Sequence, residues 1–184
     1  MKTSINMHVL LLKGGQGSER EVSLNTAKEC AKAIKKIGCK ITEVDISEIN
    51  VSSLAKINAD LCFNALHGDY GEDGSIQGLL NLLKIPYTHS GVATSSIAMN
   101  KINFKRIITD ATRFSKDPIY FPKTLKIKNN GKYFEVDYDG TFVIKPIKGG
   151  SSVGVNIIKK GNKIPHIDKF IEKQLMAEIF VGTK

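Results

Sequence analysis

The chain has 184 residues, of which 41% are hydrophobic, and a formal net charge of +9. This length and composition are enough for one ample domain or two small ones with a packed core, and they exclude a disordered or fibrous chain. The apolar run near the amino terminus is interrupted by Lys13 and two glycines, well short of a membrane span or a signal peptide, so we expect no membrane insertion.

The positive charge is spread along the sequence rather than gathered on one stripe with interleaved aromatic residues. We therefore expect solvated lysine faces and no nucleic-acid partner, while a small anionic ligand would benefit from the same field. Cys30, Cys39 and Cys62 are odd in number and show no CxxC spacing. They predict buried free thiols, which indicates the reducing cytoplasm.

In the first half of the chain, apolar strands alternate with helical periodicity. His8 to Leu12 is typical of a buried strand, and apolar residues recur at helical spacing from Ala27 to Ile37, up to a stop at Gly38. The next predicted elements are a strand over 40–45, a short helix over 52–57, a strand over 61–63 and a helix over 75–83. This alternation predicts an α/β fold with a doubly wound, mainly parallel sheet.

After Lys101 the pattern changes. Residues 102–112 are predicted to be helical, and the predicted strands are 123–127, 132–138, 142–146 and 155–158, with turns at 129–131 and 139–140. The second half is therefore expected to be an antiparallel-rich α+β unit. We place the boundary near residues 100–105, which gives domains 1–100 and 101–184.

The segment His67 to Gly78, HGDYGEDGSIQG, follows a short apolar strand and carries four glycines. Glycines allow positive φ and close backbone approach, and Asp69, Glu72 and Asp73 can cap the helix predicted next. Such a loop lies where α/β sheets bind ligands. The alternative is that His67 is a structural residue, as lone histidines more often are.

The segment Gly14 to Ser23, GGQGSEREVS, follows the first strand with a tight turn. Ser18 and Glu21 have the spacing of a capping box, and acidic residues in the first turn suit the helix dipole. The alternative is therefore that Glu19 and Glu21 are purely structural residues at a helix start. The segment lacks the GxGxxG spacing of a dinucleotide fingerprint.

The segment Lys145 to Gly154, KPIKGGSSVG, lies between two apolar runs, which predicts a hairpin tip rich in backbone and hydroxyl donors. Such a tip can fold over phosphates, with Lys145 carried into the cleft by a rigid strand. The alternative is an ordinary glycine-serine hairpin beside a surface lysine. Lys101 is likewise open to interpretation as a snorkelling lysine at the domain boundary.

These three segments and a fourth, Ile85 to Lys101, occur in one order along nearly the whole chain. Together they resemble the D-alanine–D-alanine ligase family of the ATP-grasp superfamily. The resemblance implies a Rossmann-like pre-ATP-grasp domain for substrate binding, followed by a truncated ATP-grasp nucleotide-binding subdomain. Asn100 stands where these enzymes commonly have Asp.

The resemblance also implies roles for individual residues. Glu19 meets the ammonium of the first D-alanine and braces the glycine-serine loop through Ser151, and both are expected to be catalytic. Val22 and His67 complete the substrate subsite. The implied ATP-binding residues are Lys101, Lys145, Gly149, Gly150, Ser151, Ser152, Val153, Glu178 and Phe180.

The implied activity is ATP-dependent ligation of two D-alanines through an acyl phosphate, a step of peptidoglycan synthesis. The resemblance implies Mg²⁺ as a cofactor, with its ligands in a carboxy-terminal part expected after Lys184, so this chain is expected to be an inactive fragment with no metal site of its own. Open alternatives are a noncatalytic nucleotide- or amino-acid-binding module and a related D-alanine–D-lactate ligase. The sequence leaves open whether a homodimer forms.

Overall fold

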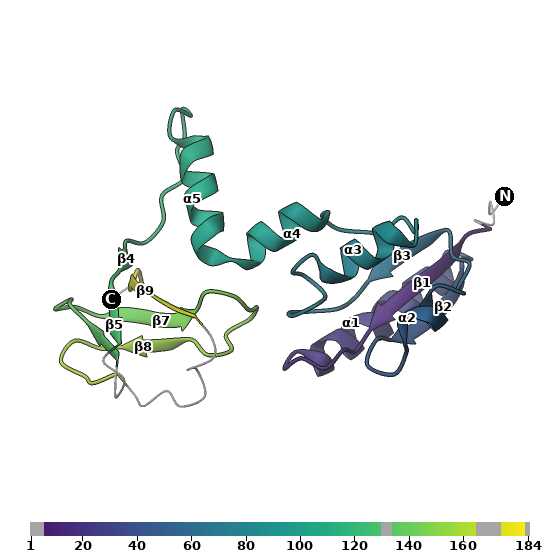
Figure 1. The fold of residues 1–184 in the computed structure, drawn as a ribbon, viewed down its shortest axis with the longest axis horizontal. Helices are drawn as coiled ribbons and strands as arrows, with labels where there is room; N and C mark the ends of the chain where they lie inside the picture. Colours follow the sequence, from purple (N-terminus) through teal and green to yellow (C-terminus); the bar gives the residue numbers. More distant parts are fainter. Residues whose placement is uncertain (1–5, 130–133, 165–173, 183–184) are drawn as a thin grey trace. The chain divides into compact units, whose positions relative to one another are not determined.

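The computed structural model describes residues 6–129, 134–164 and 174–182, and the chain divides into two compact units, residues 1–98 and 99–184 (Figure 1). The helices are α1 Arg20–Lys36, α2 Val51–Leu54, α3 Ser75–Leu82, α4 Val92–Met99 and α5 Lys101–Thr112. The strands are β1 His8–Lys13, β2 Lys40–Asp45, β3 Leu61–Asn64, β4 Thr124–Leu125, β5 Ile127–Asn129, β6 Phe134–Val136, β7 Phe142–Pro146, β8 Asn156–Ile158 and β9 Leu175–Ile179.

The first unit is built on a three-stranded sheet with the order β2-β1-β3, in which both pairs of neighbouring strands are parallel. β1 lies in the middle and is buried on both faces, which explains its continuous run of valine and leucine. The carboxyl ends of all three strands therefore meet at one edge of the sheet.

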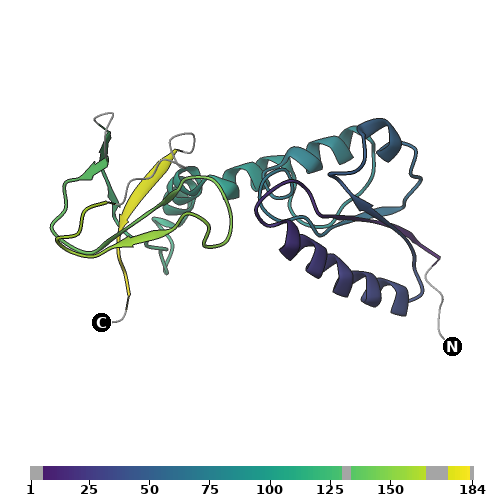
Figure 2. The same ribbon diagram turned by 90° about the horizontal axis from the view of Figure 1, so that it is seen from below.

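Helices cover both faces of this sheet (Figure 2). Because successive side chains of a strand point to opposite faces, Leu10 and Leu12 pack with Leu80 of α3, while Leu11 packs with Ala27 and Ala31 of α1. The doubly wound, parallel arrangement predicted from the sequence is confirmed.

A single residue extends the sheet beyond β3. Tyr87 forms an isolated parallel bridge with Cys62, in which the Cys62 N–H donates to the Pro86 carbonyl at 2.7 Å and the Thr88 N–H donates to the Cys62 carbonyl at 3.0 Å. The outer edge of β3 is therefore paired over part of its length.

The second unit contains a four-stranded antiparallel sheet with the order β4-β9-β7-β8 and a separate two-stranded pair, β5-β6. One face of the larger sheet carries the apolar core, which includes Phe142, Ile144, Ile158 and Ala177. The predicted antiparallel α+β unit is confirmed. The single strand predicted over 123–127 is wrong, because the chain leaves the larger sheet after Leu125 and pairs elsewhere from Ile127.

Two helices follow each other around Asn100, whereas the sequence predicted only the second. Asn100 has an extended backbone, which ends α4, and its side-chain oxygen accepts from the N–H groups of Ile102 and Asn103 at 3.1 and 3.0 Å. Asn100 is thus the N-cap of α5 and sets the start of that helix at Lys101. Residues 130–131 of the turn predicted at 129–131 and residues 132–133 of the strand predicted at 132–138 lie outside the described residues, whereas Asn129 ends β5.

The three cysteines are free, as predicted. Cys39 and Cys62 are buried and Cys30 is half-buried. Burial raises the pKa of the Cys62 thiol to about 12. Among the helices in the described ranges, none combines the length and apolar character that crossing a membrane requires.

Candidate functional site

The turn between β1 and α1 lies at the carboxyl edge of the parallel sheet, close to the end of β2. Gly14 has a φ of +75°, and a Cβ placed on it would lie 2.3 Å from the Asp45 carboxylate oxygens. The Gly14 N–H donates to Ser23 Oγ at 2.8 Å, and the buried Ser23 hydroxyl donates to the Ala65 carbonyl at 2.8 Å. Only glycine fits this close approach of the turn to the end of β2.

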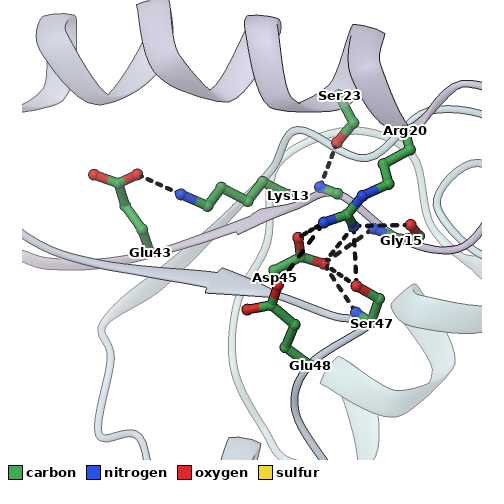
Figure 3. Close-up of polar contacts among 9 residues, drawn as sticks. Lys13, Gly15, Arg20, Ser23, Glu43, Asp45, Ser47 and Glu48 are labelled. Atoms are coloured by element: carbon green, nitrogen blue, oxygen red, sulfur yellow. Dashed lines mark hydrogen bonds and ion pairs between the residues drawn. The ribbon is translucent and has the colours of Figure 1, made fainter.

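Arg20 and Asp45 tie that turn to the end of β2 (Figure 3). Arg20 Nη2 lies 2.7 Å from Asp45 Oδ2, while Arg20 Nη1 donates to Asp45 Oδ1 and to the Gly15 carbonyl, both at 3.0 Å. Ser47 donates to the same carboxylate through its N–H and its hydroxyl. Burial alone would raise the pKa of the Asp45 carboxyl, but these donors hold it well below its ordinary value.

The capping box predicted from Ser18 and Glu21 is wrong. The helix α1 begins at Arg20, so the N-cap position is Glu19, whose side chain makes no capping hydrogen bond. The helix start is held instead by the Arg20 contacts to Gly15 and Asp45. Because the Glu19 side chain does not cap the helix, its carboxylate is available for another partner.

In the first unit, the Glu19 carboxylate lies against the residue that follows His67. A Cβ placed on Gly68 would lie 2.5 Å from Glu19 Oε2, so the Glu19 carboxylate lies against the Gly68 backbone, next to His67. His67 Nε2 lies 2.9 Å from Thr26 Oγ1 of α1, and its Nδ1 lies 3.7 Å from Glu72 Oε1. Within the described residues, no hydrogen bond reaches the Glu19 carboxylate. This arrangement offers one open carboxylate and one oriented imidazole.

The loop that carries His67 is fixed by its own glycines and carboxylates. Gly74 adopts a φ of +98° at the N-cap of α3, and Asp73 Oδ1 accepts from the Ser75 N–H at 2.9 Å. Asp73 therefore satisfies a helix-start donor as predicted, but Glu72 does not. The Glu72 side chain instead turns back toward His67, and its Oε2 accepts from the Gly68 N–H at 2.9 Å.

Asp69 of the loop and Val22 of α1 were also predicted from the sequence to have roles here, and both are exposed. Asp69, which was predicted to cap α3, is exposed, and the cap position is taken by Gly74. Val22, which the resemblance assigns to the substrate subsite, is 50% exposed on α1.

In the second unit, three neighbouring strands place polar side chains on the face opposite the apolar core. Thr124 of β4 pairs with Glu178 of β9, which in turn pairs with Val143 of β7, and Lys145 lies two residues along β7 on the same face. Lys145 Nζ lies 2.5 Å from Glu178 Oε2. The Glu178 side chain is only 6% exposed, so a buried carboxylate anchors the lysine.

The helix α5 adds two more lysines to this face, at positions one turn apart. Lys105 Nζ forms an ion pair with Glu178 Oε1, and it donates to the Pro122 carbonyl at 2.7 Å and to Thr124 Oγ1 at 3.0 Å. Lys101 Nζ donates to the Gly149 carbonyl at 2.7 Å. We call Lys101, Lys105, Lys145 and Glu178 the lysine–glutamate cluster.

The charges in this cluster perturb one another. Burial lowers the pKa of the Lys101 ammonium, and the nearby charge of Lys145 lowers it further. The charge of Glu178 acts in the opposite direction but does not outweigh them. Burial would raise the pKa of the Glu178 carboxyl, but hydrogen bonds from Lys105 and Lys145 bring it below its ordinary value. Three ammonium groups and one carboxylate leave a surplus of two positive charges, which suits an anionic ligand.

Sequence reasoning did not single out Lys105. Its spacing of four residues from Lys101 places both lysines on one face of α5, which was a usable signal. That spacing is also common on solvated helices, and Glu178 is 73 residues away in the chain.

The glycine-serine segment forms the connection of the β7-β8 hairpin, as predicted. Ser151, Ser152 and Val153 are exposed, and Gly149 and Gly150 are half-buried. The backbone is unusual here, with a φ of +113° at Gly149 and +55° at Ser151. An exposed loop that carries two serine hydroxyl groups thus begins beside Lys101.

Phe180 follows β9 directly after Ile179. Its N–H donates to the Thr141 carbonyl at 3.1 Å, and its ring is 38% exposed. The ring lies over Gly182, where an added Cβ would come within 2.4 Å of it. The Thr141 carbonyl therefore holds the backbone at the carboxyl end of β9, and Glu178 and Phe180 both lie near this end of the strand.

Known proteins resemble this chain over almost all of its length. A family model described as "D-ala D-ala ligase N-terminus" matches residues 48–90. The chain is 42% identical over 182 residues to a D-alanine--D-alanine ligase of Parvibaculum lavamentivorans, covering 96% of this chain and 57% of that protein. It is 43% identical over 161 residues to a D-alanine--D-alanine ligase of Methylobacterium radiotolerans, covering 88% of this chain and 50% of that protein.

Solved structures agree with the sequence matches. A D-alanine--D-alanine ligase from Bacillus anthracis superposes with a TM-score of 0.76 at 30% identity, covering 96% of this chain and 58% of that one. A structure of the Bacillus anthracis ligase complexed with ATP gives a TM-score of 0.75 at 28% identity, with 96% and 59% covered. The chain thus spans somewhat more than half the length of these relatives.

Proposed function

The chain belongs to the D-alanine–D-alanine ligase family, and on that premise we propose that it forms the nucleotide- and amino-acid-binding part of an ATP-dependent ligase that joins two D-alanines. The observation that carries this proposal is the lysine–glutamate cluster, in which Lys101 and Lys145 lie beside an exposed glycine-serine loop with a surplus of positive charge. A triphosphate supplies the compensating negative charge.

In the proposed reaction, the carboxylate of one D-alanine attacks the γ-phosphorus of ATP, and ADP leaves. The amine of the second D-alanine then attacks the acyl phosphate, and inorganic phosphate leaves as the peptide bond forms. The product dipeptide serves peptidoglycan synthesis, and the reaction takes place in the cytoplasm, where ATP is available and the free thiols stay reduced.

The residues of this chain bind and orient the reactants. Lys101 and Lys145 hold phosphate oxygens, and the Gly149 to Gly154 loop supplies further donors over them. Glu19 accepts the ammonium of the first D-alanine, and His67, which is oriented by Thr26, donates to its carboxylate. Phe180 holds the adenine end of the nucleotide at the end of β9, and Glu178 contributes to ATP binding through Lys145, with which it pairs.

The family resemblance implies Mg²⁺ with its ligands outside this chain. Over residues 6–129, 134–164 and 174–182, no group of three His, Cys, Asp or Glu side chains could hold a metal ion. The part proposed for this chain is therefore positioning and charge compensation.

Calorimetric titration of ATP into the 184-residue chain tests the proposal. Lys145→Met removes a charge-assisted contact to the phosphates and should weaken ATP binding by about 1.5 to 3 kcal/mol, or roughly 10- to 100-fold. Lys160→Met is the matched control, because Lys160 is exposed and pairs with Asp139 on the surface. Unchanged ATP affinity in Lys145→Met, or equal losses in both variants, contradicts the proposal.

A further inference from the structure

Lys105 is more deeply buried than a surface helix lysine. Its side chain is 15% exposed, and its ammonium meets three acceptors, namely the Pro122 carbonyl at 2.7 Å, Thr124 Oγ1 at 3.0 Å and Glu178 Oε1. An ammonium has three N–H donors, so every donor of Lys105 is used within the protein. Lys105 has none left for a ligand.

Lys101 and Lys145 differ from Lys105 in this respect. Within the described part of the chain, Lys101 Nζ has one acceptor, the Gly149 carbonyl, and Lys145 Nζ has one partner, Glu178. Each of these two ammonium groups therefore keeps donors that the described residues do not use.

Glu178 divides its two oxygens between two lysines. Oε1 pairs with Lys105 and Oε2 pairs with Lys145, and the carboxylate is almost fully buried between them. One negative charge cannot neutralise both ammonium groups. Lys105, Lys145 and Glu178 together therefore keep one net positive charge, and without Lys105 the Lys145–Glu178 pair would have none.

We propose that Lys105 is a positioning residue for the nucleotide phosphates: it takes one oxygen and the charge of Glu178, so that Lys145 keeps its positive charge for the anion. This inference rests on the proposed function, because it assumes that the anion is the phosphate chain of ATP. The contacts of Lys105 to Pro122 and Thr124 also fix α5 against β4, and this places Lys101 one turn earlier on the same face.

The test uses inorganic tripolyphosphate, which has the charge of the nucleotide phosphates without adenine. Lys105→Met should weaken its binding to the chain by about tenfold or more, although Lys105 has no donor to offer it. Lys105→Gln, which keeps a polar group near Pro122 and Thr124 but lacks the charge, should show the same loss. Lys160→Met removes the same charge at an exposed site and should change binding less than about threefold.

A second substitution separates electrostatic compensation from simple packing. In the double variant Lys105→Met with Glu178→Gln, Lys145 is no longer neutralised, so most of the lost tripolyphosphate affinity should return. A residue that only held the fold together would show no such rescue, since removing a second buried partner would destabilise the unit further. Thermal unfolding of each variant, measured alongside, identifies any change of fold.

The outcomes distinguish the inference from the proposed function. If the unchanged chain binds ATP and tripolyphosphate and Lys105→Gln binds them equally well, the inference is wrong and the proposed function stands. Failure of the double variant to regain affinity overturns the inference in the same way. If the unchanged chain binds neither anion, the proposed function fails and the inference fails with it.

Discussion

Two buried carboxylates, one in each unit, are surrounded by cations in different ways. Asp45 takes both nitrogens of one guanidinium, together with the donors of Ser47 and the N–H of Gly15. Glu178 lies between two lysines, with a third near enough to be affected by its charge. The first group has one cation between two carboxylates, since Arg20 Nη2 also lies 3.8 Å from Glu48 Oε1, and the second group has a positive surplus.

The difference separates a structural cluster from the proposed binding one. Around Asp45 the protein's own acceptors take the Arg20 guanidinium, so this cluster fastens the β1–α1 turn to the end of β2. Around Glu178 the described residues supply three ammonium groups and one carboxylate, and we propose that an anionic ligand compensates the surplus. A surplus of buried charge is therefore a better sign of a binding site than the number of ion pairs.

The largest effect on stability is expected for Gly14→Ala. The new Cβ would meet the Asp45 carboxylate at 2.3 Å in a left-handed backbone conformation, and Asp45 is fixed by Arg20 and Ser47. Unfolding by denaturant should show a loss of about 2 to 4 kcal/mol. Gly17→Ala is the matched control, because nothing lies within 4 Å of its Cβ position. Equal stability of the two variants would show that the turn is not held as described.

A smaller effect is expected for Asp45→Asn, and it depends on pH. The pKa of the Asp45 carboxyl is lower in the folded chain than its ordinary value of 3.8. Its contribution to stability is therefore complete above that value and is lost as the pH falls below it toward the folded pKa.

At neutral pH, Asp45→Asn should lower the free energy of unfolding by about 1 to 3 kcal/mol. As the pH falls below 3.8, the difference between the variant and the unchanged chain should shrink progressively. Denaturation curves across this range measure the effect, with the exposed Glu29→Gln as a comparison that changes little. A constant difference at every pH would count against the Asp45 ion pair as its source.

The smallest effect on stability is expected for Glu19→Gln, because no hydrogen bond from the described residues reaches that carboxylate. The free energy of unfolding should change by less than about 0.5 kcal/mol. D-alanine binding, followed by NMR titration of the labelled chain, should nevertheless weaken about tenfold. Glu21→Gln, two residues along and exposed, is the control. Loss of stability without loss of binding would make Glu19 a structural residue.

The sequence predicted elements well where local patterns decide the structure. The strands over 40–45 and 142–146 have the bounds predicted from their flanking glycines and polar residues. The helix α4 was missed because its apolar residues form no clear stripe along one face. The supposed capping box failed because tertiary contacts of Arg20, and not a local cap, hold the start of α1.

The candidate site was predictable in its motifs but not in its pairings. Lys101, Lys145 and the glycine-serine loop stood out by type and spacing. The partners of Glu178 did not, because α5 and β7 supply them from distant parts of the chain, and only the fold brings them to β9. Residue spacing alone carries no signal for contacts over such separations.

The bridge between Cys62 and Tyr87 bears on how the chain avoids aggregation. A parallel sheet with a bare edge invites pairing with the strands of other molecules. Residues 86–88 occupy the outer edge of β3, and Pro86 has no N–H with which a further strand could bond. At the opposite edge, β2 carries Lys40 and Glu43 on its exposed positions. One border is protected by a proline-containing segment and the other by charge, so we expect growth of this sheet between molecules to be disfavoured on both sides.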